Sequence, residues 1–144
     1  MSYSRILIHA VWATKERKPL MNKPNKDALC QHIREDAVTK GIHLLNINGW
    51  VDHLHAFISL TTAQNVETVI NLLKGNSSHW ASKNLNWREP FSWQEGFFAG
   101  SVSPSNFEIV NRYIDRQETH HRVKTFAQEY DELMNAFGLT GDSR

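Results

Sequence analysis

The first half of the chain alternates between the two spacings of apolar residues that distinguish strands from helices. Residues 3–14 are apolar on both faces of an extended chain, which predicts a strand buried within a sheet. Residues 25–40 carry apolar side chains at helical spacing, which predicts a helix. Two strand-like segments follow, 42–49 and 50–60, and they meet near Asn48–Gly49. An Asn-Gly pair between such segments favours a tight hairpin turn at that dipeptide.

The second half combines one further strand with three helices. Residues 66–83 form another amphipathic pattern, and Gly75 in its middle weakens the preference for an unbroken helix. Residues 91–102 are aromatic and punctuated by glycine, which predicts a strand. The pair Ser103–Pro104 is a hydroxyl cap followed by a proline, which marks the start of a helix. That helix is expected to span about 104–119, and a final helix is expected to span about 123–137.

This order of elements predicts an α+β fold. Strand, helix, strand, strand, helix and strand make the β-α-β-β-α-β arrangement of a ferredoxin-like (RRM-like) domain with an antiparallel sheet. The core spans about residues 3–102, and the two C-terminal helices are appended to it. With 144 residues and no linker-like segment, the chain is expected to be one domain over residues 1–144.

Composition narrows the cellular setting more than the function. Cys30 is the only cysteine, so no disulfide can form within the chain, and a cytoplasmic location is expected. No apolar run approaches the roughly 20 residues of a membrane-spanning helix, and we see no secretory signal, so no membrane partner is expected. The formal net charge of +1 neither supports nor excludes a nucleic-acid partner.

The segment His53-Leu54-His55 carries the first chemical signal. Residues two apart share a face of a strand, so the two imidazoles point the same way while Leu54 points to the opposite face. Rings that converge from such positions can share one metal ion, and two His ligands leave coordination positions open for a substrate. The competing interpretation is a pair of ordinary histidines on a strand face, so the motif needs a partner elsewhere in the chain.

Tyr113 and Gln117 give the second signal. They lie four residues apart in the predicted 104–119 helix, and therefore on one helical face. A tyrosine can attack phosphorus and form a covalent phosphotyrosine. The glutamine carbonyl can serve as a third ligand to a divalent cation beside the two histidines. Taken alone, Tyr113 is better explained as an amphipathic helix residue with a packed ring.

Together, these two elements resemble the single-tyrosine HUH transposases of small bacterial insertion sequences, the group of IS200-like and REP-associated tyrosine transposases. The family's motif of His, a hydrophobic residue and His matches His53-Leu54-His55. Its tyrosine with a glutamine one turn later matches Tyr113 and Gln117. Segments 9–17, 73–78 and 93–98 are also similar to the family, and the resemblance covers roughly residues 3–120.

The resemblance implies a metal-dependent enzyme that cuts and rejoins single-stranded DNA at the ends of a mobile element, usually beside a DNA hairpin. Tyr113 would attack a DNA phosphate, stay attached to the 5′ end and release a 3′-OH, and strand transfer to another 3′-OH would follow. The metal, Mg²⁺ or Mn²⁺, would be held by His53, His55 and Gln117. The family works as a homodimer that can share its active sites, so the action of Tyr113 within or between subunits stays open.

Basic side chains are the candidates for contacts with DNA phosphates. Lysine and arginine are frequent between residues 15 and 26, and further cations lie on the second and third predicted helices. Contacts of this kind would be independent of DNA sequence and sensitive to salt. A solvated surface loop is the competing interpretation for the 15–26 segment. The candidate residues are Lys15, Arg17, Lys18, Lys74, Arg112 and Arg116.

Two other functions fit the same residues. The first is a domesticated relative that binds single-stranded DNA or RNA without cutting it. The second is a metal-dependent phosphodiesterase that uses water as its nucleophile, in which Tyr113 is structural. The presence of all four expected catalytic residues favours the transposase, because a protein that only binds has no physical need for them.

Overall fold

A four-stranded antiparallel sheet organises the computed structural model, which describes residues 2–139. The strands lie side by side in the order β2-β3-β1-β4, so the first strand in the sequence pairs with the third and the fourth. This is the arrangement expected of a β-α-β-β-α-β chain, and the predicted α+β fold is confirmed. The strands are β1 (Ile6–Ala13), β2 (His43–Gly49), β3 (His53–Leu60) and β4 (Phe98–Val102).

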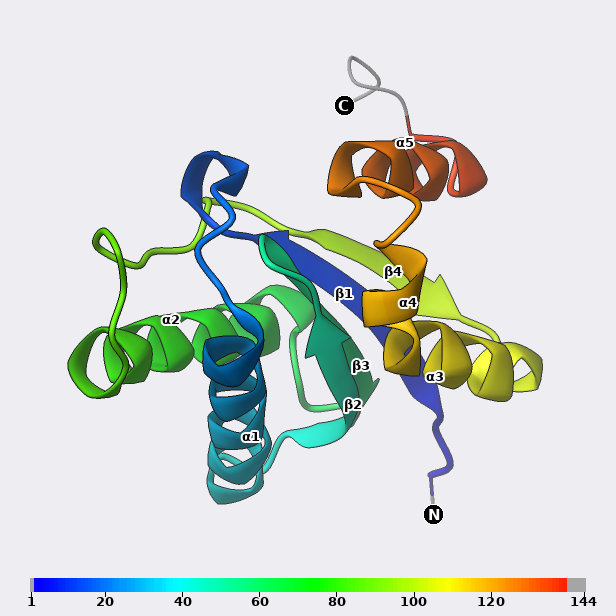
Figure 1. The fold of residues 1–144 in the computed structure, drawn as a ribbon. Helices are drawn as coiled ribbons and strands as arrows, with labels where there is room; N and C mark the ends of the chain where they lie inside the picture. Colours follow the sequence, from blue (N-terminus) through cyan, green and yellow to red (C-terminus); the bar gives the residue numbers. More distant parts are fainter. Residues whose placement is uncertain (1, 140–144) are drawn as a thin grey trace.

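Helices cover both faces of the sheet (Figure 1). α1 and α2 pack on one face and enclose the larger apolar core, together with Trp12 and Ile58. α3, α4 and α5 lie over the opposite face, where smaller apolar clusters form around Phe57 and Phe98. None of the helices within residues 2–139 is both long and apolar enough to cross a membrane. The helices are α1 (Lys23–Thr39), α2 (Val66–Asn84), α3 (Phe107–Asp115), α4 (Gln117–His120) and α5 (Phe126–Ala136).

The central position of β1 explains why its sequence is apolar on both faces. It pairs with β3 along one edge and with β4 along the other, and residues 7–12 are all buried. Side chains of β1 and β3 alternate between the two helix layers. The layer of α3–α5 receives His9 from β1 and His53 and His55 from β3, whereas Leu54 joins the core beneath α1 and α2.

The turn between β2 and β3 lies later in the chain than the sequence predicts. Asn48 and Gly49 remain in β2, where they pair with His55 and Leu54, and the chain reverses over residues 50–52. The prediction of a turn at Asn48–Gly49 is therefore wrong. Gly49 instead allows the backbones of β2 and β3 to approach closely, because a Cβ at this position would lie 2.1 Å from the backbone oxygen of His53.

Two other predicted elements differ from the structure, since one is shorter than expected and the other is divided. Of the predicted strand 91–102, only β4 pairs continuously, and Trp93 makes an isolated bridge to Thr14. The predicted helix 104–119 is divided in two, because Arg116 leaves the helical conformation between α3 and α4. α2, in contrast, continues without interruption through Gly75.

Replacing Gly49 by alanine is expected to destabilise the protein, because the new methyl group would collide with backbone atoms of His53 and Leu54. Overpacking of this kind typically lowers the free energy of unfolding by about 1–3 kcal/mol. Gly75→Ala is the matched control, since nothing lies within 4 Å of a Cβ at this helical position. Alanine there should raise the free energy of unfolding by roughly 0.5–1 kcal/mol. Urea-unfolding curves measure both effects, and a Gly49→Ala variant as stable as the wild type would contradict this account.

Candidate active site

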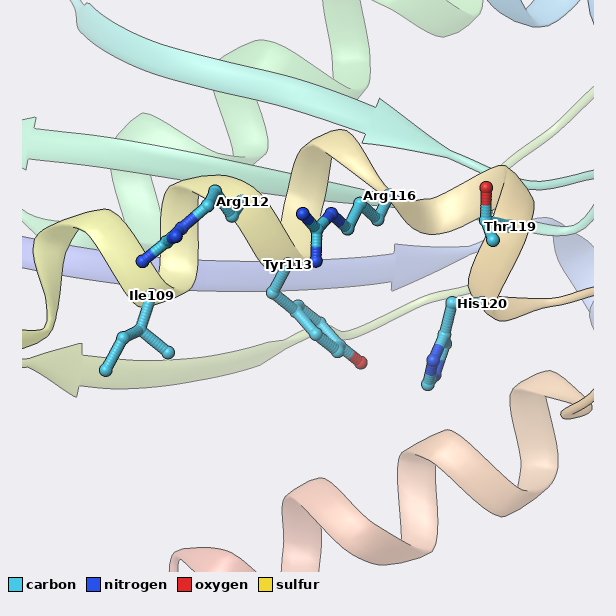
Figure 2. A pocket seen from close by; sticks show the side chains of 6 residues that line it. All are labelled: Ile109, Arg112, Tyr113, Arg116, Thr119 and His120. Atoms are coloured by element: carbon cyan, nitrogen blue, oxygen red, sulfur yellow. The ribbon is translucent and has the colours of Figure 1, made fainter.

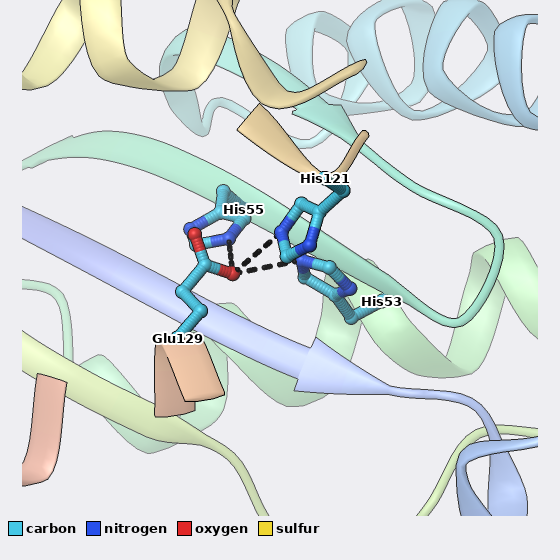
Figure 3. Close-up of side chains that lie close together, drawn as sticks. All are labelled: His53, His55, His121 and Glu129. Carbon is cyan, nitrogen blue, oxygen red and sulfur yellow. Dashed lines mark hydrogen bonds and ion pairs between the residues drawn. The ribbon is translucent and has the colours of Figure 1, made fainter. Parts of the chain in front are cut away.

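Three histidines and one glutamate meet over the sheet, although they come from distant parts of the sequence (Figure 3). β3 supplies His53 and His55, the connection after α4 supplies His121, and α5 supplies Glu129. The Nε2 atoms of all three imidazoles lie 3.0 Å from the same carboxylate oxygen, Oε1 of Glu129. All four side chains are buried, and their ligand atoms lie within 4.8 Å of one another.

The other ring nitrogen of each histidine is already engaged. Nδ1 of His53 lies 2.8 Å from a carboxylate oxygen of Asp52, and Nδ1 of His55 lies 2.7 Å from Nε2 of His9. Nδ1 of His121 lies 2.7 Å from the backbone oxygen of Lys124. Histidines that bind metals usually have such an outer partner, which fixes the ring and leaves the second nitrogen for the ion. The donor set therefore fits a divalent metal ion.

Burial and hydrogen bonding set the charges in this cluster. Burial lowers the pKa of His9 to about 3 and the pKa of His55 and of His121 to about 4, so these rings are neutral near pH 7. Burial also opposes the charged form of His53, but Asp52 and Glu129 outweigh it and raise the pKa of this ring. Burial disfavours the charged form of Glu129, yet hydrogen bonds with His53 and His55 lower its pKa to about 2. The cluster is thus rich in the electron-pair donors that a cation requires.

Gln117 and Tyr113 lie at the edge of the same cluster. Gln117 is fully buried at the start of α4, with its amide oxygen 3.2 Å from Nε2 of His53. Its amide nitrogen lies 3.2 Å from Oε2 of Glu129. The hydroxyl of Tyr113, on α3, donates a hydrogen bond to the same Oε2. The structure therefore brings together the four residues expected to carry the chemistry, even though α3 and α4 are separate helices.

Sequence reasoning missed His9, His121 and Glu129. Neither His9 nor His121 has a neighbour at a spacing that suggests a shared metal, and Glu129 lies beside two other acidic residues, Asp131 and Glu132, in the predicted C-terminal helix. A signal for Glu129 is nevertheless present. It lies three residues after Phe126 and four before Leu133, on the face of α5 that packs towards the sheet. A carboxylate inside an apolar stripe needs a partner, and that requirement points to a buried site.

Two of the candidate DNA-contacting residues flank Tyr113. Arg112 and Arg116 are exposed and line a groove of about 430 Å³ together with Tyr113 and His120 (Figure 2). The hydroxyl of Tyr113 points along this groove in the direction of His120. The groove therefore gives solvent a path to the tyrosine between two permanent positive charges.

The remaining basic candidates lie in different environments. Lys15 and Arg17 are exposed in the loop after β1, and the guanidinium of Arg17 lies 5.1 Å from the ring centres of Phe126 and Tyr130 on α5. The ammonium of Lys18 is 2.8 Å from Glu89, so its charge is already paired.

Lys74 differs from the other basic candidates because it is buried. Its ammonium donates hydrogen bonds to the backbone oxygens of Gln94 and Gly96, at 2.8 and 2.7 Å. This placement explains Lys74 as a clamp on the segment before β4.

Comparisons with known proteins show the family of the chain. Residues 2–117 match the family model described as "Transposase IS200 like". The chain is 24% identical over 115 residues to the ISDra2 transposase TnpA of Deinococcus radiodurans, covering 76% of this chain and 81% of that protein. It is 23% identical over 114 residues to the transposase for insertion sequence element IS200 of Salmonella typhimurium, covering 76% of this chain and 74% of that protein.

Two solved structures share the fold. A putative transposase from Deinococcus radiodurans superposes with a TM-score of 0.65 at 21% identity, covering 81% of this chain and 93% of that one. A REP-associated tyrosine transposase bound to a REP hairpin superposes with a TM-score of 0.57 at 12% identity, covering 84% of this chain and 72% of that one. The family match spans the elements from β1 to Gln117 and is long enough to settle the assignment. The chain belongs to the family of IS200-like transposases.

Proposed function

We propose that this transposase cuts and rejoins single-stranded DNA with Tyr113 as its nucleophile. The observation that supports this role is the shared carboxylate of Glu129, which contacts the Tyr113 hydroxyl through one oxygen and the three imidazoles through the other. The hydroxyl therefore lies beside the group of donors that fits a divalent ion. A nucleophile and an electrophilic metal must be this close to act on one phosphate.

The reaction exchanges one phosphoester bond for another and therefore needs no external energy source. The phenolic oxygen of Tyr113 loses its proton and bonds to the phosphorus as the bond from phosphorus to the 3′ oxygen breaks. The 3′ oxygen takes a proton and leaves as a 3′-OH, while the 5′ end stays attached as a phosphotyrosine. A different 3′-OH then attacks the phosphotyrosine, which restores a DNA phosphodiester and frees Tyr113.

His53, His55 and the amide oxygen of Gln117 are the proposed ligands of a divalent ion, Mg²⁺ or Mn²⁺. When bound, such an ion polarises the scissile phosphate and offsets the negative charge that develops on it. Asp52 and His9 fix the two imidazole rings from the opposite side. Their role is to hold the ring nitrogens ready for the ion.

The groove beside Tyr113 is the proposed entry for single-stranded DNA. Arg112 and Arg116 can pair with phosphates on either side of the tyrosine. Lys15 and Arg17 are exposed elsewhere on the surface and are further candidates for phosphate contacts. The related REP-associated transposase is bound to a REP hairpin, which supports a DNA hairpin as part of the substrate here. Family resemblance also suggests a homodimer. Because Tyr113 reaches the histidine cluster of its own chain through Glu129, the geometry favours a site formed within one subunit.

Tyr113→Phe is expected to abolish the covalent protein–DNA adduct, because phenylalanine has no oxygen to bond to phosphorus. The measurement is a denaturing gel after incubation with labelled single-stranded DNA that carries the element ends and Mn²⁺. Tyr130→Phe is the matched control and should retain the adduct, since Tyr130 packs beside Phe126 and Arg17 on α5. Cleavage by Tyr113→Phe would favour water as the nucleophile, and binding without cleavage by the wild type would favour the non-catalytic alternative.

His53→Ala is expected to weaken Mn²⁺ binding by at least the roughly 10- to 100-fold that loss of an outer-shell partner causes. It should also remove adduct formation, and a chelator should do the same to the wild type. His79→Ala is the matched control, because His79 is exposed on α2, on the other side of the sheet. Adduct formation that persists in excess chelator would contradict a metal-dependent reaction.

Arg112→Ala and Arg116→Ala are expected to weaken binding of single-stranded DNA several-fold. Each should reduce the slope of log binding constant against log salt by about 0.7, because each removes one phosphate contact with a single strand. Lys40→Ala serves as the control, since Lys40 follows α1 and pairs with Asp36. Fluorescence anisotropy at several salt concentrations measures both quantities. An unchanged slope in both arginine variants would exclude this groove as the path of the DNA backbone.

A further inference from the structure

The carboxylate of Glu129 occupies the point at which the three imidazoles converge. Its Oε1 atom is equidistant from the three Nε2 atoms, and the side chain is only 1% exposed. It is carried by α5, which lies beyond the segment that matches the family model. The metal-binding role of the His-Leu-His motif therefore does not by itself account for this residue.

His121 is prepared as a ligand in the same way as the two histidines of β3. Its Nδ1 is held by the backbone oxygen of Lys124, and its Nε2 faces the carboxylate. Its ring is nearly parallel to that of Trp50, with ring centres 6.3 Å apart, and lies edge-on to His53. A surface histidine has no reason to be fixed so completely, whereas a metal ligand requires this outer support.

We infer that His121 and Glu129 are ligands of the same divalent ion as His53 and His55, and that this ion fastens α5 across the active site in the absence of DNA. The inference builds on the metal site of the proposed function and adds two ligands to it. Three imidazole nitrogens and one carboxylate oxygen suit Mn²⁺, Co²⁺ or Zn²⁺ better than Mg²⁺, which prefers oxygen ligands. Together with the amide oxygen of Gln117 from the proposed function, the ion would have five protein donors.

The fastened α5 also covers the nucleophile. Oε2 of Glu129 accepts the hydrogen bond of the Tyr113 hydroxyl, and Phe126 stacks on His53 with ring centres 3.9 Å apart. A DNA phosphate cannot contact both Tyr113 and the ion until the Glu129 carboxylate has moved away. Because a phosphate is also an anionic oxygen donor, it can take the place of Glu129 on the ion. The described state is thus a resting one that substrate must open.

The ligand assignment is tested by titrating the purified chain with Mn²⁺ and measuring free Mn²⁺ by electron paramagnetic resonance. Glu129→Gln and His121→Ala are each expected to weaken Mn²⁺ binding by roughly 10-fold or more. Asp131→Asn is the matched control, because it removes an exposed carboxylate from the same helix. Circular dichroism confirms that each variant is folded. Wild-type Mn²⁺ affinity in both Glu129→Gln and His121→Ala, with weakened binding in His53→Ala, would overturn the inference.

The fastening of α5 is tested on the wild-type chain by hydrogen exchange with mass spectrometry. Saturating Mn²⁺ should slow amide exchange in residues 126–136 several-fold relative to chelator, and exchange in α2 should change little. The slowing should vanish in Glu129→Gln and persist in Asp131→Asn and Tyr113→Phe. Equal exchange of α5 with and without bound Mn²⁺ would overturn the inference. Neither measurement involves DNA or cleavage, so failure here is distinct from failure of Tyr113 to form an adduct.

Discussion

The burial of one carboxylate determines the arrangement of the catalytic face. A charged Glu129 can remain in the interior only if its oxygens are hydrogen-bonded, and three imidazoles, a tyrosine and a glutamine supply those partners. These partners come from β3, α3, α4 and the connection before α5. Docking of α5 and the positions of the candidate catalytic side chains are therefore parts of one network. Removing the carboxylate would leave several donors without a partner at once.

Much of the fold is predictable from the spacing of apolar residues. The doubly apolar β1 indicates a central strand, and alternation along β3 places both histidines on one face, because period-two patterns report directly on sheet geometry. The turn near Asn48–Gly49 is not predictable in this way. The dipeptide suits a hairpin turn, but the same glycine is required for the close approach of two backbones, and the sequence pattern is identical in both cases.

The site is only half predictable, for a physical reason. His53 with His55, and Tyr113 with Gln117, are pairs linked by local spacing, so secondary structure alone brings each pair together. His9, His121 and Glu129 join the cluster through tertiary contacts between separate elements. Local spacing can show that Glu129 lies on the apolar face of its helix, but it cannot show which side chains it meets. Charge in the sequence likewise does not show which basic side chains are buried. Lys74 is a candidate phosphate contact by its sequence, and in the structure its ammonium donates hydrogen bonds to two backbone oxygens.

The four residues of the histidine–glutamate cluster lie on both sides of a long stretch of sequence, and this has a consequence for synthesis of the protein. β3 emerges from the ribosome well before α5, and a domain acquires its contacts as its elements become available. The two histidines of β3 lack His121 until residue 121 has been made, and they lack Glu129 until residue 129 has been made. The order of translation itself then separates the time at which the sheet can form from the time at which the histidine cluster is complete.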